Sequence, residues 1–111
     1  MNEVNENIVN FLKIIADTTR LSILQFLKNN ETTASEIQGA LNKSQSTISQ
    51  QLKLLINVEL VSFRRVGAKK FYKIKNPEIF NILSIIMAFI SNQNKEKIDQ
   101  LTSIDILDTL H

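Results

Sequence analysis

The sequence predicts a small, mainly α-helical protein that carries one β-hairpin. Helix breakers are scarce, since the 111 residues include only two glycines and one proline. Apolar residues recur at three- and four-residue spacing over most of the chain, which is the period of an amphipathic helix. Between residues 60 and 75 they instead alternate with polar residues on both sides of Gly67-Ala68, as two strands around a tight turn would. The predicted order of elements is therefore α-α-α-α-β-β-α.

The first two helices are predicted from spacing and from one cap. A first amphipathic helix is expected over residues 3–15, where the apolar side chains recur at helical spacing: Ile8, Phe11, Leu12 and Ile15. Asp17 or Thr18 then caps a second helix. This second helix ends in the polar run at residues 28–31, and its apolar residues are Leu21, Ile23, Leu24 and Leu27.

A pair of closely spaced helices is predicted next. The segment from Thr33 to Glu36 has the form of a capping box, in which the threonine hydroxyl accepts from the third amide and the glutamate reaches back to the cap amide. The short helix that starts there ends near residues 42–43. Ser44 can cap the following helix, whose apolar side is Ile48, Leu52, Leu55 and Ile56. The gap of about three or four residues is the turn length of a helix-turn-helix.

The C-terminal third is predicted as two further helical segments. Beyond Pro77, residues 78–92 are apolar around much of the helical circumference, so one side can face a core and another a partner. From Lys95 the chain turns polar, yet apolar residues return at every third position: Ile98, Leu101, Ile104, Leu107 and Leu110. We therefore expect one domain over residues 1–94 and an amphipathic helical extension over residues 95–111.

Positive charge is concentrated between residues 43 and 75. This segment holds eight Lys and Arg residues against one acid, Glu59, so it is net +7 in a chain of net charge +2. A cationic helix followed by a cationic hairpin is typical of a surface that meets nucleic-acid phosphates. A polar helix face can also be merely solvated, and strand lysines also discourage edge-to-edge aggregation. The coincidence of both with two capped helices, in the order that one DNA-binding module requires, favours a DNA interface.

A helix-turn-helix followed by a β-hairpin is the winged-helix arrangement, in which the second helix of the pair enters the DNA major groove. The side chains predicted to contact base edges from that recognition helix are Gln45, Ser46, Thr47, Ser49 and Gln50, with Gln51 as a further candidate. The cations predicted to contact the DNA backbone are Lys43, Lys53, Arg64, Arg65, Lys69 and Lys70. Arg20 can pair with an acid or contact a phosphate, and we favour the structural role.

Three stretches of the chain resemble the ArsR/SmtB family of winged-helix repressors. They are LKIIADTTRLSIL at residues 12–24, SQSTISQQLKLL at residues 44–55, and Leu60-Val61 with RRVGAKKFY at residues 64–72. The resemblance covers about residues 8–90, and it implies a homodimer that binds an inverted repeat and represses transcription until a signal relieves it. The implied dimer interface joins the first and last helices, and its expected residues are Ile8, Phe11, Ile82, Ile86 and Phe89.

The resemblance does not extend to the metal sites of that family. Members that sense soft metals carry a Cys-x-Cys pair where this chain has Thr33 and Ser35, and neutral hydroxyls do not replace thiolates as ligands. A second family site uses Asp and His of the last helix, where residues 78–92 offer only Glu78. Asp105, Asp108 and His111 have ligand-like spacing, but terminal residues are more simply explained as a solvated tail. We expect no metal, no cofactor and an inducer of unknown chemistry.

Two alternative functions stay open at this stage. One is an architectural winged helix that binds DNA without sequence preference, and the other is a protein-interaction module that uses the apolar parts of residues 78–92 and 98–110. An enzyme is not expected, because the chain has no cysteine, a single terminal histidine and no phosphate-cradling glycine loop. The acidic start and the lack of roughly 20 consecutive apolar residues predict a cytoplasmic protein without a membrane partner.

Overall fold

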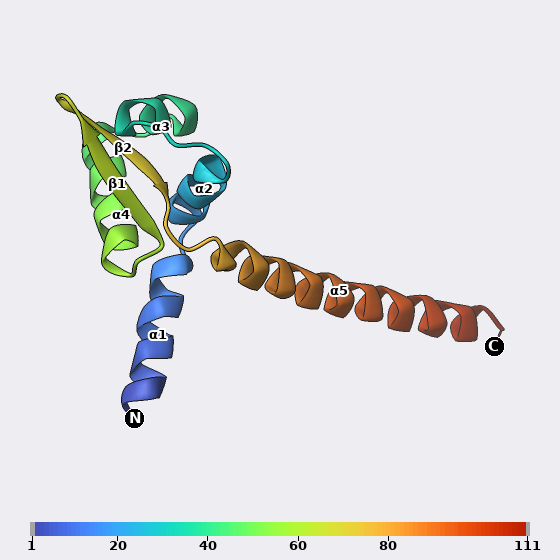
Figure 1. Cartoon of the computed structure of the whole chain (residues 1–111). Coiled ribbons are helices and arrows are strands. Elements are labelled where there is room, and N and C mark those ends of the chain that lie inside the picture. Colours follow the sequence, from blue (N-terminus) through green and yellow to red (C-terminus); the bar gives the residue numbers. More distant parts are fainter. Residues whose placement is uncertain (1, 111) are drawn as a thin grey trace. The chain divides into compact units, whose positions relative to one another are not determined.

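Figure 1 shows the computed structural model of the chain, which describes the backbone of residues 2–110 and the side chains of residues 2–95. The elements are α1 (Glu3–Ile15), α2 (Thr18–Leu27), α3 (Ala34–Leu41), α4 (Gln45–Asn57), β1 (Val61–Val66), β2 (Lys69–Ile74) and α5 (Glu78–Leu110). This is the predicted order, that of a winged helix-turn-helix. The chain divides into two compact units, residues 1–77 and residues 78–111.

Side-chain caps fix where the helices of the first unit begin. The N-caps of α1 to α4 are Asn2, Asp17, Thr33 and Ser44, whose side-chain oxygens each accept from the backbone amide three residues further on, at 2.9–3.3 Å. Each cap satisfies one of the amides that the first turn of a helix leaves without a partner. The caps predicted at Thr33 and Ser44 are confirmed, and α2 uses Asp17 rather than Thr18.

The core of the first unit lies where α2, α3, α4 and β1 meet. The side chains buried there are Ile23, Leu24, Leu27, Ile37, Ile48, Leu52, Leu55, Leu60 and Val61, none of them more than 3% exposed. Burying one such side chain favours folding by about 1.5–3 kcal/mol before conformational entropy is counted. The core therefore packs α3 and α4 against each other and leaves the opposite face of α4 on the surface.

A sharp turn joins α3 to α4. Asn42 ends α3 in the left-handed conformation, with φ 54° and ψ 49°, and its amide donates to the carbonyl of Gln38. Asparagine tolerates this conformation better than most residues other than glycine. The amide of Lys43 donates to the same carbonyl at 3.3 Å, and Ser44 then caps α4. The predicted short turn of the helix-turn-helix is confirmed.

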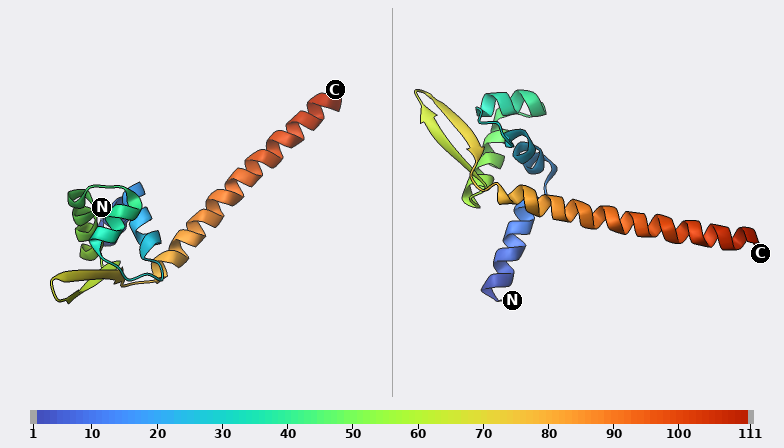
Figure 2. Two further views of the ribbon diagram at one scale, coloured as in Figure 1. Left: turned by 90° about the horizontal axis from the view of Figure 1, so that it is seen from above. Right: turned by 45° about the vertical axis from the view of Figure 1, so that its right-hand side comes forward.

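Strands β1 and β2 form an antiparallel hairpin, paired from Val61↔Ile74 to Val66↔Lys69. Gly67 has a φ of 63° in the two-residue turn, a conformation that side-chain-bearing residues rarely adopt. Thr32, just before α3, forms a bridge to β2: its amide donates to the Tyr72 carbonyl at 3.0 Å and its carbonyl accepts from the Tyr72 amide at 2.7 Å. The bridge anchors the hairpin, whose tip extends away from the helices in both views of Figure 2.

Helix α1 buries only the C-terminal end of its apolar stripe. Ile15 is buried and α1 contacts α2, whereas Val4, Ile8 and Leu12 are 66%, 51% and 48% exposed. Such side chains are usually covered when they line one continuous face of a helix. The predicted amphipathic pattern of α1 is therefore real, but most of its apolar face lies on the surface of the chain.

The second unit is the single helix α5, which is 33 residues long. The sequence predicted two helical segments here, but residues 78–110 contain no glycine or proline, so the polar residues 91–97 continue the helix. Exposed apolar side chains in its described part are Ile82, Ile85, Ile86, Met87, Phe89 and Ile90. Within the described residues, no helix combines the length and the apolarity that a membrane span requires. The side chains of Asp105, Asp108 and His111 lie outside the described residues.

Candidate nucleic-acid interface

Helix α4 carries its core face and its polar face on opposite sides. Ile48, Leu52 and Leu55 are buried. The exposed residues of the opposite side are Gln45, Ser46, Ser49, Gln50 and Lys53, which include four of the five side chains predicted to contact bases. Thr47 is half-buried, and its hydroxyl accepts from the Ser44 hydroxyl at 2.8 Å. The polar face of α4 is thus displayed to solvent over its first three turns.

Gln51 does not belong to this exposed face. It is half-buried at the edge of α4, and its side-chain oxygen Oε1 accepts a hydrogen bond from Nη1 of Arg20 at 2.5 Å. The sequence offered Gln51 as a further base-contacting candidate because it continues the polar run. Its partner comes from α2, 31 residues away in the chain, so spacing within α4 alone could not identify the contact.

The register of the hairpin divides its cations between two faces. Arg65 pairs with Lys70 and Phe63 pairs with Tyr72 across the strands, and alternation along each strand places all four side chains on one face. Arg64 pairs with Phe71 on the opposite face. Lys70 Nζ lies 4.7 Å from the centre of the Phe63 ring, within the range of a cation–π contact. Arg65 and Lys70 therefore share the face that turns toward α4.

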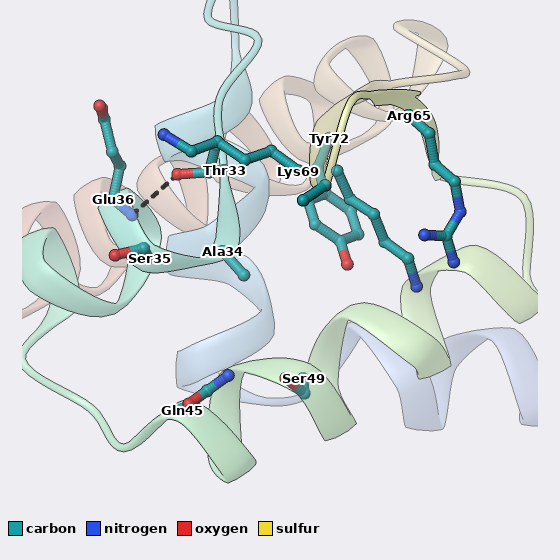
Figure 3. Close-up of a pocket in the computed structure, with 11 residues that line it drawn as sticks. Thr33, Ala34, Ser35, Glu36, Gln45, Ser49, Arg65, Lys69 and Tyr72 are labelled. Atoms are coloured by element: carbon teal, nitrogen blue, oxygen red, sulfur yellow. Dashed lines mark hydrogen bonds between the residues drawn. The ribbon is translucent and has the colours of Figure 1, made fainter.

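A groove of about 560 Å³ lies between the start of α3, the exposed face of α4 and the hairpin. In Figure 3, Tyr72 and Arg65 descend from the hairpin toward α4, which presents Gln45 and Ser49. The lining residues are Thr33, Ala34, Ser35, Glu36, Gln45, Ser49, Arg65, Ala68, Lys69, Lys70 and Tyr72. A second hollow of about 330 Å³ continues along α4, lined by Ser49, Leu52, Lys53, Ile56, Phe63, Lys70 and Tyr72.

The groove brings together only part of the predicted set. Gln45 and Ser49 of α4 lie in it with three cations of the β1–β2 hairpin, which is the wing of the fold: Arg65, Lys69 and Lys70. Lys53 borders the second hollow instead. The predicted residues that line neither hollow are Lys43, Ser46, Thr47, Gln50 and Arg64. Residues predicted to contact bases and residues predicted to contact phosphates therefore line the same groove.

Tyr72 contributes a neutral hydroxyl to this groove. Burial raises the pKa of the Tyr72 phenol above its ordinary value, and the nearby Arg65 acts in the opposite direction. The phenol therefore keeps its proton at neutral pH and can donate a hydrogen bond to an acceptor such as a phosphate oxygen. Its ring lies 5.8 Å from that of Phe63, centre to centre.

Arg64 is engaged within the fold. Its Nε donates to Oε1 of Glu31, and its guanidinium lies 5.6 Å from the centre of the Phe71 ring. Glu31 precedes Thr32, whose backbone bridges β2 and whose hydroxyl donates to Glu36 at 3.1 Å. The sequence pattern revealed neither contact, because Glu31 falls in the polar run that ends the second helix and Thr32 lies between that run and the next cap. Together these contacts attach the hairpin to the start of the helix-turn-helix.

The groove includes Thr33 and Ser35, the two residues that the sequence resemblance places where metal-sensing proteins carry a Cys-x-Cys pair. Both offer hydroxyl oxygens, and Thr33 uses its oxygen to cap α3. In the part of the chain that the structure describes, no three His, Cys, Asp or Glu side chains are grouped so that they could hold a metal ion.

Comparison with known proteins identifies the family. The profile described as "Bacterial regulatory protein, arsR family" matches residues 17–62, from the cap of α2 into β1. The transcriptional repressor SdpR of Bacillus subtilis is 30% identical over 87 residues, which cover 78% of this chain and 97% of SdpR. This chain belongs to the ArsR family. The family and the fold are those of transcriptional regulators, which are not enzymes.

Other relatives of this ArsR-family chain cover it less evenly. A transcriptional repressor SmtB homolog of Synechocystis sp. is 29% identical over 77 residues, 69% of this chain and 58% of the relative. A probable mercury resistance operon repressor of Streptomyces lividans is matched over 60% of its length. The chain thus spans less than two thirds of these two curated relatives.

Two solved structures share the fold. HlyU of Vibrio cholerae, described as a transcriptional activator, has a TM-score of 0.67 at 30% identity, with 80% of this chain and 97% of HlyU covered. The homodimeric winged helix-turn-helix DNA-binding domain of Mb0332 from Mycobacterium bovis has a TM-score of 0.71 at 22% identity, with 84% and 86% covered. The predicted winged helix-turn-helix fold is confirmed.

Proposed function

We propose that this ArsR-family protein is a dimeric, sequence-specific DNA-binding regulator that represses transcription from an inverted-repeat operator. The observation that carries the proposal is the groove in which Gln45 and Ser49 of α4 face Arg65, Lys69 and Lys70 of the wing. Amide and hydroxyl groups suit base edges, and long cations suit phosphates. A groove with this division of chemistry fits a duplex whose major groove receives α4.

The exposed face of α4 supplies the proposed base contacts. Gln45, Ser46, Ser49 and Gln50 point to solvent, and Thr47 stands beside them at the start of the helix. Glutamine can form two hydrogen bonds with adenine, so Gln45 and Gln50 are the strongest candidates for sequence discrimination. Because Gln51 is held by Arg20, we leave it out of the base-contacting set.

The backbone contacts are proposed for the cations around that face. Lys43 and Lys53 flank the polar side of α4, and Arg65, Lys69 and Lys70 border the groove from the wing. Arg64 remains a proposed phosphate contact, because its side chain is 61% exposed although it pairs with Glu31. Such contacts place the protein on the duplex without distinguishing sequences.

The dimer is proposed from the exposed apolar faces of α1 and α5. Of the proposed interface residues, Ile8, Ile82, Ile86 and Phe89 are exposed, and Phe11 is half-buried. One recognition helix contacts few base pairs, whereas a two-fold dimer places two such helices about 34 Å apart, one turn of DNA. The homodimeric Mycobacterium bovis domain supports the same assembly here.

The proposal includes a domain division and a signal of undefined chemistry. Residues 1–94 would bind DNA and dimerise, and residues 95–111 would form a helical extension. The protein would act in the cytoplasm. Thr33 and Ser35 offer no thiolates to a metal ion, so relief of repression would not depend on a soft metal bound at these two positions.

Fluorescence anisotropy with DNA from upstream of the protein's own gene, and with scrambled DNA of equal length, tests the proposal. We expect binding to the upstream fragment at least about 10³-fold tighter than to the scrambled one. Equal affinities with a steep salt dependence would favour an architectural DNA-binding protein, and no binding at low salt would favour a protein-interaction module.

Two classes of variant separate base from phosphate contacts. Gln50→Ala should weaken upstream binding by about 1–3 kcal/mol with little effect on scrambled DNA, whereas Gln25→Ala, on the exposed surface of α2, should change neither. Arg65→Ala and Lys69→Ala should weaken both complexes and lower the slope of log affinity against log salt by about 1 each. Equal losses for Gln50→Ala on both DNAs would contradict base contact.

A further inference from the structure

Arg20 joins three elements of the first unit through one guanidinium. It lies in the first turn of α2, where its backbone amide donates to the Asp17 cap at 2.9 Å. Its Nε donates to the carbonyl of Ile14 at 2.5 Å and its Nη2 to that of Lys13 at 3.3 Å, both in the last turn of α1. Its Nη1 donates to the Gln51 side chain on α4 at 2.5 Å. The side chain is half-buried, and its three kinds of nitrogen are all used.

The contacts with α1 follow from the chemistry of a helix end. The last four carbonyls of a helix lack intrahelical partners, and the C-terminus carries a partial negative charge. A guanidinium supplies both the donors and the positive charge in one rigid plane. Arg20 therefore caps α1, the helix that bears Val4, Ile8 and Leu12 on its exposed apolar face.

The contact with α4 has a different consequence. Gln51 sits between the buried face that includes Leu52 and the exposed face that includes Gln50. Apolar packing of Ile48, Leu52 and Leu55 is not directional, so it tolerates small rotations of α4 about its axis. A hydrogen bond at the edge of the helix is directional and resists them. Rotation of α4 would move Ser46, Ser49 and Gln50 relative to the wing.

We propose that Arg20 is a positioning residue for DNA recognition, which holds α4 through Gln51 at the rotation that base contact requires and ties that helix to the end of α1. The inference rests on the proposed function, because it assigns a role in sequence discrimination to a residue that touches no base. Arg20 and Gln51 act as one unit in it. Removal of either should therefore have the same effect on recognition.

A double-mutant cycle on Arg20 and Gln51 tests the proposal. The probes are a duplex that the wild-type protein selects from a randomised pool and a scrambled duplex of equal length, with affinities measured by anisotropy. Gln51→Ala leaves the α1 cap intact, and Arg20→Lys keeps the charge but cannot bridge three acceptors. We expect each single variant to bind the selected duplex about tenfold more weakly, the scrambled duplex nearly as well as wild type, and the double variant no more weakly than the singles.

Arg65→Ala is the matched control. Arg65 lies on β1, outside α4, so its loss should fall equally on both duplexes and should add to that of Arg20→Lys. Gln51→Glu should keep wild-type discrimination between the two duplexes, because a carboxylate accepts from the guanidinium at least as well as an amide does. Circular dichroism and sedimentation should show that all of these variants keep the fold and the association state of the wild type.

The outcomes distinguish this inference from the proposed function. Additive losses for Arg20→Lys and Gln51→Ala would overturn the positioning role, because Gln51 would then act on DNA independently. If the loss of affinity for the selected duplex accompanies a drop in thermal stability and disappears at lower temperature, Arg20 acts only as a structural cap of α1. Failure of the wild-type protein to select any sequence would overturn the proposed function and, with it, any role in recognition.

Discussion

Helices α1 and α4 have the same length and the same kind of sequence, yet they meet different surroundings. Both contain 13 residues, begin at a side-chain cap and carry an apolar stripe. The stripe of α4 is buried in the core through Ile48, Leu52 and Leu55. The stripe of α1 is buried only at Ile15; Phe11 is half-buried, and Val4, Ile8 and Leu12 are exposed. An amphipathic pattern thus predicts that a face will be covered, but not whether the same chain will cover it.

This difference suggests that α4 stabilises the fold of one chain, whereas α1 serves the association of two chains. The apolar side of α4 serves the fold, which leaves its polar side free for a ligand. The apolar side of α1 contributes little to the fold of one chain, which leaves it free for a second copy. The proposed dimer is the arrangement in which both helices have their apolar faces covered.

The same truncation in the two helices should give the largest contrast. Leu52→Ala removes a buried side chain and should lower the free energy of unfolding by about 2–5 kcal/mol, because it leaves a cavity. Leu12→Ala, at a half-exposed site, should cost less than about 1 kcal/mol in dilute protein. Urea titrations at low concentration measure both values. Equal losses would mean that α1 is packed within the chain as firmly as α4.

A charge on the exposed stripe should act on assembly rather than on folding. Ile8→Asp should raise the dimer dissociation constant at least about a hundredfold, since a carboxylate would be carried into an apolar interface. Asn10→Asp, exposed on the opposite side of α1, is the control and should leave the dimer intact. Sedimentation equilibrium gives the constants. A normal dimer in Ile8→Asp would remove α1 from the interface.

The caps offer a smaller test of the same contrast. Ser44→Ala should lower the free energy of unfolding by about 1 kcal/mol, because the start of α4 is held by the rest of the domain and cannot fray without loss. Asn2→Ala should cost only a few tenths of that, because the start of α1 is exposed. Thermal unfolding at matched concentration compares them. A larger effect at Asn2 would contradict the ranking.

The smallest expected effect concerns Tyr72, which lies on β2 and lines the groove beside α4. The pKa of Tyr72 is raised in the folded protein, so its contribution to stability is complete below the unfolded value near 10 and is lost as pH rises through the folded value. Wild type should therefore lose stability relative to Tyr72→Phe only above about pH 10. Urea titrations across that range measure the difference, and a constant difference would show that Tyr72 titrates alike in both states.

The features that the sequence predicted correctly depend on residues that are adjacent in the chain. The caps at Thr33 and Ser44, the turn at Asn42 and the hairpin around Gly67 each follow from a few adjacent residues, and each is confirmed. The continuity of α5 was missed because a polar run is a weaker boundary than a glycine or a proline.

The contacts that the sequence did not predict join residues far apart in the chain. Arg20 meets Gln51 across 31 residues, and Arg64 meets Glu31 across 33. Periodicity describes which face of an element is apolar but not which polar group on another element it will meet. For the candidate site, composition located the cationic segment, and only the register of β1 and β2 separated Arg65 and Lys70 from Arg64.

Tyr72 also gives the protein a natural optical reporter. The chain contains one tyrosine and no tryptophan, so its ultraviolet emission under selective excitation comes from a single ring. That ring lies between α4 and the wing, on the lining of the groove. Emission from the unlabelled protein therefore follows events in this one place, without interference from the rest of the chain.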